Sequence, residues 1–295
     1  MARYNKRVGI TMLGMMSTPS PTHWLPTNTF AGKRAFVTGG GTGLGLEISR
    51  GLAALGAHVT IASRSKEHHL GFLTEASEED WDAGAVVLDV REDPSVREAI
   101  DNFCEQHGGI DILINNAAGN FVCPAERLSS NAWRSVLGIV LDGTFSCSKY
   151  AGRHMIAGDG GVHLNVVATY AWTGMPGVVH SASAKAGVLA MTRTLAAEWA
   201  RHGIRVNAIA PGPFQSEGAA GNLWPDETTE ERMREAIPAK RFGTTEEMAT
   251  HALYLCSDAA AYITGECMVI DGGLSLASGR MWEPGERLKR KRDKD

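Results

Sequence analysis

The chain of 295 residues lacks the features that mark membrane and nucleic-acid-binding proteins. It has no apolar run near the ~18 residues that a membrane-spanning helix requires. It also lacks an excess of positive charge, since its formal net charge is −4, so neither a membrane nor a nucleic acid is expected as a partner. The composition, with 43% hydrophobic and 21% charged residues, is typical of a globular protein. The chain is long enough to form one large core.

Cysteine is scarce and scattered. The chain has five cysteines and no Cys-x-x-Cys pair, so reduced thiols in an intracellular protein are expected. They are Cys104, Cys123, Cys147, Cys256 and Cys267. The adjacent His68 and His69 have no third ligand nearby, so no metal is predicted and the pair is expected in a solvated loop.

Residues 1–28 contain no acidic residue, and the first acidic residue of the chain is Glu47. Residues 1–28 are expected to form a disordered extension, which is either a transit peptide, a frayed bacterial N-terminus or the result of a start codon placed too early. The expected location is the bacterial cytoplasm, or the mitochondrial matrix if the segment is a transit peptide. Residues 279–295 form a charged C-terminal tail.

Between these ends, short apolar runs alternate with segments of helical spacing. Strands are expected over residues 33–38, 58–62, 85–88, 110–114, 162–167, 204–210 and 267–270. This alternation predicts a single-domain α/β fold over residues 29–278, a Rossmann-type doubly wound parallel sheet. Residues 66–83 are expected to be irregular, and residues 214–240 to form a lid.

The first strand runs into a glycine-rich turn that is followed by a helix. Glycines at such a turn let backbone N–H groups approach a pyrophosphate at the helix N-terminus. The cofactor-binding residues expected here are Gly39, Gly41, Thr42, Gly43, Leu44 and Gly45. The second strand ends at Ser63 and Arg64, where an acid would bind the ribose of NAD, so the sequence predicts a 2′-phosphate and hence NADPH.

A tyrosine and a lysine after the fifth strand predict a proton donor. Tyr170 follows that strand, and Lys185 lies near the start of the next helix with Ser181 one turn earlier on the same face. Because a nearby cation favours the phenolate, Lys185 is expected to lower the pKa of Tyr170.

These motifs resemble the short-chain dehydrogenase/reductase superfamily over residues 30–276. The markers are Thr38-Gly39-x-x-x-Gly43-x-Gly45, Asn115-Asn116-Ala117-Ala118-Gly119, Lys185 and Pro211-Gly212. The usual Asn, Ser, Tyr and Lys tetrad is not kept, because its first three positions fall on Val140, Ala168 and Ser181.

One subfamily accounts for the departure. Gly119-Asn120-Phe121 and Ser181-Ala182-Ser183-Ala184-Lys185-Ala186-Gly187 resemble the 2,4-dienoyl-CoA reductases. In the mitochondrial type the tyrosine lies fifteen residues before the lysine, as Tyr170 does here. The resemblance implies NADPH-dependent reduction of 2,4-dienoyl-CoA thioesters in β-oxidation of unsaturated fatty acids, by a homotetramer.

The resemblance also implies roles for individual residues. The catalytic residues are Tyr170, Lys185, Asn120 and Ser181, and Lys185 also binds the nicotinamide ribose. Further cofactor contacts are Asp89, Val90, Asn116, Ala117, Gly119, Pro211, Gly212, Pro213 and Phe214. The acyl-CoA contacts are Arg91, Phe121 and Ser129, while a basic contact of the family is replaced by Asn222.

Three other functions stay open at this stage. A trans-2-enoyl-CoA reductase shares much of the pattern, whereas the changed Ser and Tyr positions disfavour a 3-oxoacyl reductase. A pseudoenzyme that binds the cofactor without turnover is disfavoured because Asn120, Tyr170 and Lys185 occur together.

Overall fold

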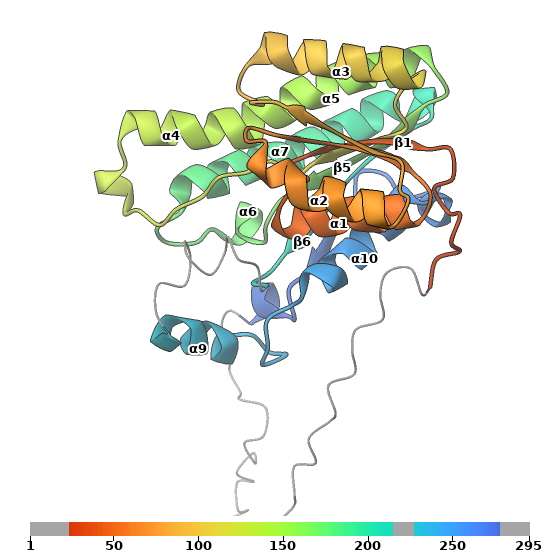
Figure 1. The fold of residues 1–295 in the computed structure, drawn as a ribbon. Helices are drawn as coiled ribbons and strands as arrows, with labels where there is room; N and C mark the ends of the chain where they lie inside the picture. Colours follow the sequence, from red (N-terminus) through yellow and green to blue (C-terminus); the bar gives the residue numbers. More distant parts are fainter. Residues whose placement is uncertain (1–23, 215–226, 278–295) are drawn as a thin grey trace, which may run out of the picture.

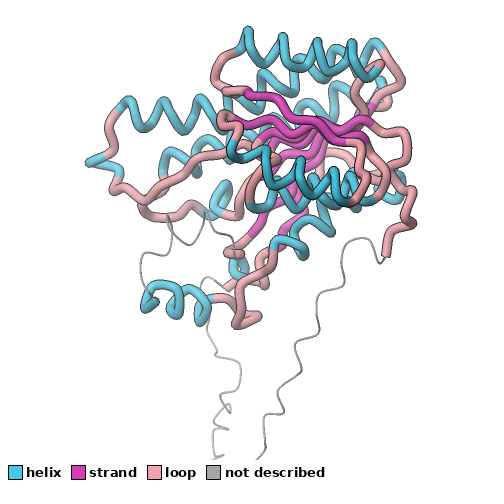
Figure 2. Tube along the Cα trace, viewed as in Figure 1, coloured by secondary structure: helices cyan, strands magenta, loops and turns pink. Residues whose placement is uncertain are grey.

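The computed structural model describes residues 24–214 and 227–277. Its centre is a sheet of seven parallel strands in the order β3-β2-β1-β4-β5-β6-β7 (Figure 2). The strands are β1 (Arg34–Thr38), β2 (His58–Ser63), β3 (Ala83–Val87), β4 (Ile112–Asn115), β5 (Gly161–Val166), β6 (Ile204–Pro211) and β7 (Cys267–Ile270). The order reverses between β1 and β4, so the predicted doubly wound Rossmann-type sheet is confirmed.

Helices cover both faces of this sheet (Figure 1). On one face lie α1 (Gly43–Ala54), α2 (Glu67–Glu78) and α10 (Thr245–Cys256). On the other lie α3 (Asp93–His107), α4 (Ser130–Leu137), α5 (Gly143–Ala157) and α7 (Val179–Trp199). The short α6 (Tyr170–Thr173) follows β5, and α9 (Glu227–Ala236) follows β6. Because both faces are covered, the central strands are apolar on both sides rather than alternating.

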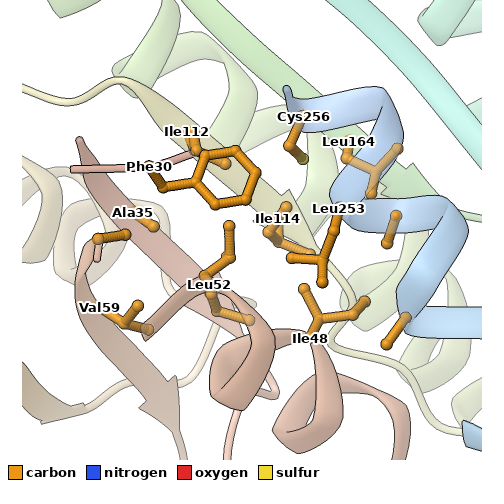
Figure 3. Close-up of a cluster of buried hydrophobic side chains, with 14 of the residues drawn as sticks. Phe30, Ala35, Ile48, Leu52, Val59, Ile112, Ile114, Leu164, Leu253 and Cys256 are labelled. Carbon is orange, nitrogen blue, oxygen red and sulfur yellow. The ribbon is translucent and has the colours of Figure 1, made fainter. Parts of the chain in front are cut away.

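The core beneath α1 and α10 shows why these elements pack where they do. Ile48 and Leu52 are four residues apart on α1 and point into the same cluster as Leu253 of α10 (Figure 3). Val59 and Ile114 face them from the sheet. An apolar stripe of helical period therefore meets a continuous apolar strand surface, which is the pairing that buries both.

The long helical stretch from α4 to α5 is not uniform. A π-helical turn, η3 (Gly138–Asp142), joins α4 to α5. It places Val140 in the buried cluster between α4, α7 and β6. A π turn inside a helix is often found beside a functional site.

The prediction of an irregular segment over residues 66–83 is wrong. Helix α2 occupies much of it, and its buried residues His69, Phe72 and Ala76 follow a three-and-four spacing. Acidic residues on the exposed side obscure this spacing in the sequence. The two histidines therefore lie in a helix and not in a solvated loop, and His69 is buried.

Smaller differences concern element ends. The third strand begins two residues earlier than predicted, at Ala83. Tyr170, expected shortly after the fifth strand, is the first residue of the short helix α6. Helix α3 begins at Asp93, and the Asp93 carboxylate accepts hydrogen bonds from Ser146 (2.7 Å) and Tyr150 (2.6 Å).

The predicted C-terminal tail, residues 1–23 of the predicted N-terminal extension and residues 215–226 of the predicted lid lie outside the described residues. Residues 1–23, 215–226 (which include Asn222) and 278–295 belong to this part. Leu25, within the predicted 1–28 extension, is already buried in the core beneath α1. Within the predicted lid, α9 leads to Ala239, whose N–H donates to the Gly272 carbonyl oxygen (3.1 Å).

Candidate active site

The glycine-rich turn after β1 has space only for glycine at several positions. Gly39 and Gly43 have φ values of 63° and 52°. A Cβ atom on Gly45 would lie 2.1 Å from the Gly39 carbonyl oxygen. Helix α1 begins at Gly43, and its N-cap residue Thr42 makes no side-chain capping bond. The Thr42 side chain therefore leaves the first N–H groups of α1, including that of Leu44, without a capping acceptor. Such free N–H groups at a helix start can bind a phosphate.

Asn116 secures this turn to the end of β4. Its Nδ2 donates to the carbonyl oxygens of Thr38 (3.2 Å) and Gly39 (3.0 Å). The Thr38 hydroxyl in turn accepts from the N–H groups of Asn116 and Ala117, both at 3.1 Å. The side chain of Asn116 thus supports the turn. A Cβ atom on Gly119 would meet only Ile139, at 3.5 Å, so packing does not require glycine there.

A buried amide network behind the turn was not predicted from the sequence. Asn115 Nδ2 donates to Ser148 Oγ (3.0 Å) and to Asn165 Oδ1 (2.9 Å). Asn165 Nδ2 continues the network to Thr192 Oγ1 (2.8 Å). These bonds connect β4, β5, α5 and α7, and they fix the edge of the sheet at which the site lies.

Many of the predicted cofactor residues surround one cavity of about 140 Å³ at this edge. Its lining residues are Gly39, Thr42, Ala62, Ser63, Arg64, His68, Leu88, Asp89, Val90, Ala117, Ala118 and Ile139. The cavity lies where the strand order reverses, which is the position at which doubly wound sheets bind ligands. The uncapped helix end and the glycine turn fit the pyrophosphate of a dinucleotide.

Helix α2 supports the wall of this cavity that carries Ser63 and Arg64. Ser63 Oγ donates to the Ser65 carbonyl oxygen (3.0 Å) and therefore accepts from His69 Nε2 (2.8 Å). Gly41 packs so tightly on the first turn of α2 that a Cβ atom would lie 2.0 Å from the His68 carbonyl oxygen. His68 and His69 were not predicted as site residues, because the helix that carries them was missed.

Asp89 and Arg91 pair with each other. The separation between Arg91 Nη2 and Asp89 Oδ2 is 2.5 Å. The hydrogen bond from Arg91 lowers the pKa of Asp89, and Arg64 contributes a smaller Coulombic lowering. The predicted adenine contact, which lines the cavity, and the predicted acyl-CoA contact are therefore neighbours.

Tyr170, Ser181 and Lys185 come together at the carboxyl end of β5. Tyr170 Oη lies 3.1 Å from Ser181 Oγ, which joins α6 to α7. Lys185 Nζ donates to the carbonyl oxygen of Val166, the last residue of β5. Ser181 is 1% exposed and Lys185 is 6% exposed, so the serine and the ammonium group are held away from water.

The pKa directions at this centre differ from the sequence-based expectation. Burial raises the pKa of Tyr170, and its hydrogen bond with Ser181 opposes the rise. Burial also lowers the pKa of Lys185 to about 8. The expected lowering of the Tyr170 pKa by Lys185 is wrong in this structure, because desolvation dominates and the ammonium group bonds the Val166 carbonyl instead.

Asn120 and Phe121 reach the N-terminal end of α7 from the loop after β4. Asn120 Oδ1 accepts from the N–H of Phe121 (2.9 Å). A backbone N–H can only donate, so the Asn120 side-chain oxygen is engaged and its Nδ2 is the group left to donate. The Phe121 ring stacks on His180, with centroids 4.4 Å apart and planes at 30°. His180 is a further residue that sequence reasoning missed.

The remaining predicted residues lie farther along the same strand edge. Ser129 is exposed and caps α4, accepting from the Ala132 N–H (3.2 Å). Pro211 ends β6, and the Gly212 N–H donates to the Ile270 carbonyl oxygen (2.8 Å). The Gly243 N–H donates to the Pro213 carbonyl oxygen (3.1 Å), beside the single bridge between Phe214 and Gly243.

Across residues 24–214 and 227–277, no cluster of three or more His, Cys, Asp or Glu side chains is arranged to hold a metal ion. No helix in the same part of the chain is long and apolar enough to cross a membrane.

Comparison with known families and proteins gives a consistent result. Residues 39–275 match the family described as enoyl-(acyl carrier protein) reductase. A Bacillus subtilis protein named "Probable 2,4-dienoyl-CoA reductase [(2E)-enoyl-CoA-producing]" is 46% identical over 243 residues, covering 82% of this chain and 96% of the relative. The Pongo abelii peroxisomal 2,4-dienoyl-CoA reductase [(3E)-enoyl-CoA-producing] is 40% identical, covering 88% and 89%.

Solved structures share the fold at similar identity. A short-chain dehydrogenase from Bacillus anthracis is 47% identical with a TM-score of 0.77, covering 85% of this chain and 99% of that one. A gluconate 5-dehydrogenase from Burkholderia cenocepacia, solved with NADP and tartrate, is 34% identical with a TM-score of 0.80, covering 85% and 98%. The resemblance predicted from the motifs is thus confirmed, and the chain belongs to the short-chain dehydrogenase/reductase family of oxidoreductases.

Proposed function

We propose that this protein catalyses the NADPH-dependent reduction of 2,4-dienoyl-CoA thioesters to enoyl-CoA, a step in the β-oxidation of unsaturated fatty acids. The observation that carries the proposal is the contact between Tyr170 and Ser181, 3.1 Å apart, beside the buried Lys185. This contact supplies a phenol where the usual family tyrosine is replaced by serine. The names of the Bacillus subtilis and Pongo abelii relatives support the same substrate class.

The cofactor proposed for this site is NADPH, which would supply the hydride when bound. The uncapped start of α1 and the turn over Gly39–Gly45 would hold the pyrophosphate. Ser63 and Arg64 would face the 2′-phosphate, and the complex of the gluconate 5-dehydrogenase with NADP supports this class of cofactor. Lys185 would bind the nicotinamide ribose.

The residues around Tyr170 would stabilise the charge that develops on the substrate. Hydride addition to the far end of the diene moves negative charge to the thioester oxygen. Asn120, with Nδ2 left to donate, and Tyr170 would bind that oxygen. Donors of this kind each contribute roughly 3–4 kcal/mol when they are preorganised and water is excluded.

Tyr170 would also return the proton. Because burial raises its pKa, Tyr170 stays protonated near neutral pH and is ready to act as an acid. A dienolate carbon is far more basic than a phenolate, so the phenol transfers its proton in the favourable direction. The pair with Ser181 opposes the rise in the pKa and orients the hydroxyl.

The alternatives to this function are two other reductase activities and a pseudoenzyme that only binds the cofactor. The match to enoyl-(acyl carrier protein) reductase favours a trans-2-enoyl thioester as second choice of substrate. The structural relatives include a gluconate 5-dehydrogenase. In this chain, however, Ser181 stands at the position of the usual family tyrosine, which disfavours that activity. The paired Tyr170 and Ser181 beside Lys185 speak against a chain that only binds the cofactor.

Removing the Tyr170 hydroxyl tests the proposal. Tyr170→Phe keeps the ring, and we expect kcat with a 2,4-dienoyl-CoA to fall by about 10²- to 10⁴-fold, the usual cost of losing a positioned general acid. NADPH affinity should stay unchanged, because the ring does not line the cofactor cavity. Ser181→Ala should be milder, since it removes a partner of the donor and not the donor.

Tyr262→Phe is the matched control, because Tyr262 is fully exposed and its loss of a hydroxyl should leave kcat unchanged. Near-complete activity of Tyr170→Phe together with an inactive Ser181→Ala would show that the serine is the donor, and the proposal would be wrong.

The expected assembly and location remain proposals. We propose a homotetramer formed through α4, α5, α7 and β7, and a bacterial cytoplasmic location. Apolar side chains exposed on α5 and β7, such as Phe145 and Val269, support further contacts on these elements.

A further inference from the structure

Helix α2 places His68 in the wall of the cavity proposed for the cofactor. His68 is exposed and lines this cavity together with Arg64 and Asp89. Within residues 24–214 and 227–277, no hydrogen bond engages the His68 ring. The ring nitrogens are therefore open to a ligand in the cavity, and an imidazole can donate a hydrogen bond whether it is neutral or protonated.

Two contacts fix the position of this first turn of α2. The His68 backbone packs so closely on the glycine turn that a Cβ atom on Gly41 would lie 2.0 Å from the His68 carbonyl oxygen and 3.1 Å from the His68 Cβ atom. The neighbouring His69 is buried, and its Nε2 donates to Ser63 Oγ (2.8 Å). The His68 side chain therefore begins against the turn that would hold the cofactor phosphates.

The hydroxyl of Ser63 is already engaged. Its single proton is donated to the Ser65 carbonyl oxygen (3.0 Å), and its oxygen accepts from His69. A phosphate presents acceptor oxygens, so Ser63 could donate to it only by giving up the bond to Ser65. Of the polar side chains on this wall, His68 is the one whose ring nitrogens are open beside Arg64.

The charge around Arg64 favours a further donor. Arg64 contributes to the lowering of the Asp89 pKa, and Asp89 also pairs with Arg91 (2.5 Å). These three side chains together carry one net positive charge, whereas a phosphate monoester carries about −1.5 to −2 at pH 7. A donor that can also take up a proton, such as an imidazole, would balance part of the remaining negative charge.

We propose that His68 is a second 2′-phosphate-binding residue, which donates a hydrogen bond to the phosphate beside the contact from Arg64. This inference rests on the proposed function, in which NADPH is the cofactor. The contacts of Gly41 and His69 hold α2 in the position that brings His68 to the cavity. His68 would contribute to the preference for NADPH over NADH, while the reduction of the thioester stays with the groups already described.

Direct binding measures this contribution without a thioester substrate. His68→Leu removes both ring nitrogens, and we expect the dissociation constant for NADP+, measured by titration calorimetry, to rise roughly 10-fold, as for the loss of one hydrogen bond to a charged group. The dissociation constant for NAD+ should not change, which also shows that the cavity is intact. His68→Gln keeps a donor and should recover part of the affinity for NADP+.

Two fragments of the cofactor separate the 2′-phosphate from the phosphates on the 5′ side. Adenosine 2′,5′-bisphosphate carries the 2′-phosphate, and 5′-AMP lacks it. His68→Leu should weaken the binding of the first fragment by the same factor as that of NADP+ and leave the second unchanged. An equal loss with NADP+ and NAD+, or with both fragments, would place the contact elsewhere on the nucleotide and overturn the proposal.

His154→Leu is the matched control. His154 lies on α5, where its Nε2 bonds Asp101 (2.7 Å), and it does not line the cofactor cavity. The variant removes an imidazole from the surface away from the site, so its dissociation constants for NADP+ and NAD+ should equal those of the wild type.

The two proposals fail in different ways. A wild-type protein that binds NADP+ with the expected dependence on His68 but reduces no dienoyl-CoA would refute the proposed reaction and leave the role of His68 intact. An affinity for NADP+ that is unchanged in His68→Leu would refute the role of His68 and leave the proposed reaction unaffected.

Discussion

At the scale of single residues, the site contains charged and polar groups that reduce stability. Lys185 is the clearest case, because burial lowers its pKa from 10.5 to about 8. That difference corresponds to ~3 kcal/mol against the folded state at neutral pH. One hydrogen bond to the Val166 carbonyl offsets only part of this cost. Lysine at this position is therefore favourable for function and unfavourable for folding.

The burial of Lys185 predicts a pH-dependent gain of stability in Lys185→Met. Below pH 8 Lys185 is protonated in both the folded and the unfolded wild-type protein, so the full cost of burying its charge is subtracted from the free energy of unfolding. Between pH 8 and 10.5 the unfolded chain binds more protons than the folded one, so wild-type stability rises with pH. We expect the variant to be inactive yet more stable at pH 7 by up to ~3 kcal/mol, with the gap narrowing towards pH 10.

Urea unfolding of both proteins at pH 7 and pH 10 measures this gap. Lys149→Met is the control, because Lys149 is a partly exposed lysine on α5 that pairs with Asp93. If the difference in free energy of unfolding between wild type and Lys185→Met is the same at both pH values, the predicted cost of burying the Lys185 charge is wrong.

At the scale of elements, the sequence predicted local patterns but did not predict contacts between residues far apart in the chain. The strand, glycine turn and helix around Gly43 follow each other in the chain, so their order and role could be predicted. The Asn115–Asn165 hydrogen bond joins residues fifty positions apart and has no local signal. The pKa of Tyr170 depends on burial and on where the Lys185 ammonium group points, and neither is visible in residue spacing.

Helix α2 bears on the choice between NADPH and NADH. It supports Ser63 through His69, and the next residue, Arg64, is exposed, where it would meet the 2′-phosphate of the proposed NADPH. Arg64→Ala should raise KM for NADPH by the loss of a charge-assisted contact, ~1.5–3 kcal/mol or roughly 10- to 150-fold, and leave KM for NADH nearly unchanged.

Steady-state kinetics with both cofactors measure the selectivity. Arg97→Ala is the matched control, because the Arg97 guanidinium is exposed on α3 and pairs with Asp101. An equal loss with NADPH and NADH would show that Arg64 does not recognise the phosphate.

At the scale of the whole molecule, the apolar surface bears on assembly. Phe145 and Ile156 are exposed on α5, and Val269 is exposed on β7. Solvent-exposed apolar side chains of this kind on a helix and an edge strand are typical of a surface that another copy covers. We expect light scattering at micromolar concentration to give a mass near four times 31.6 kDa, whereas a mass near 31.6 kDa would contradict the tetramer.

The proposed function depends on which thioester the assembled protein reduces. The most direct measurement is NADPH consumption by the purified wild-type protein with a 2,4-dienoyl-CoA, a trans-2-enoyl-CoA and a 3-oxoacyl-CoA of equal chain length, side by side. Under the proposal that Tyr170 binds the thioester oxygen and protonates a dienolate, we predict the highest kcat/KM for the dienoyl-CoA. A higher kcat/KM for either of the other two, or NADPH binding without turnover of any, would contradict the account.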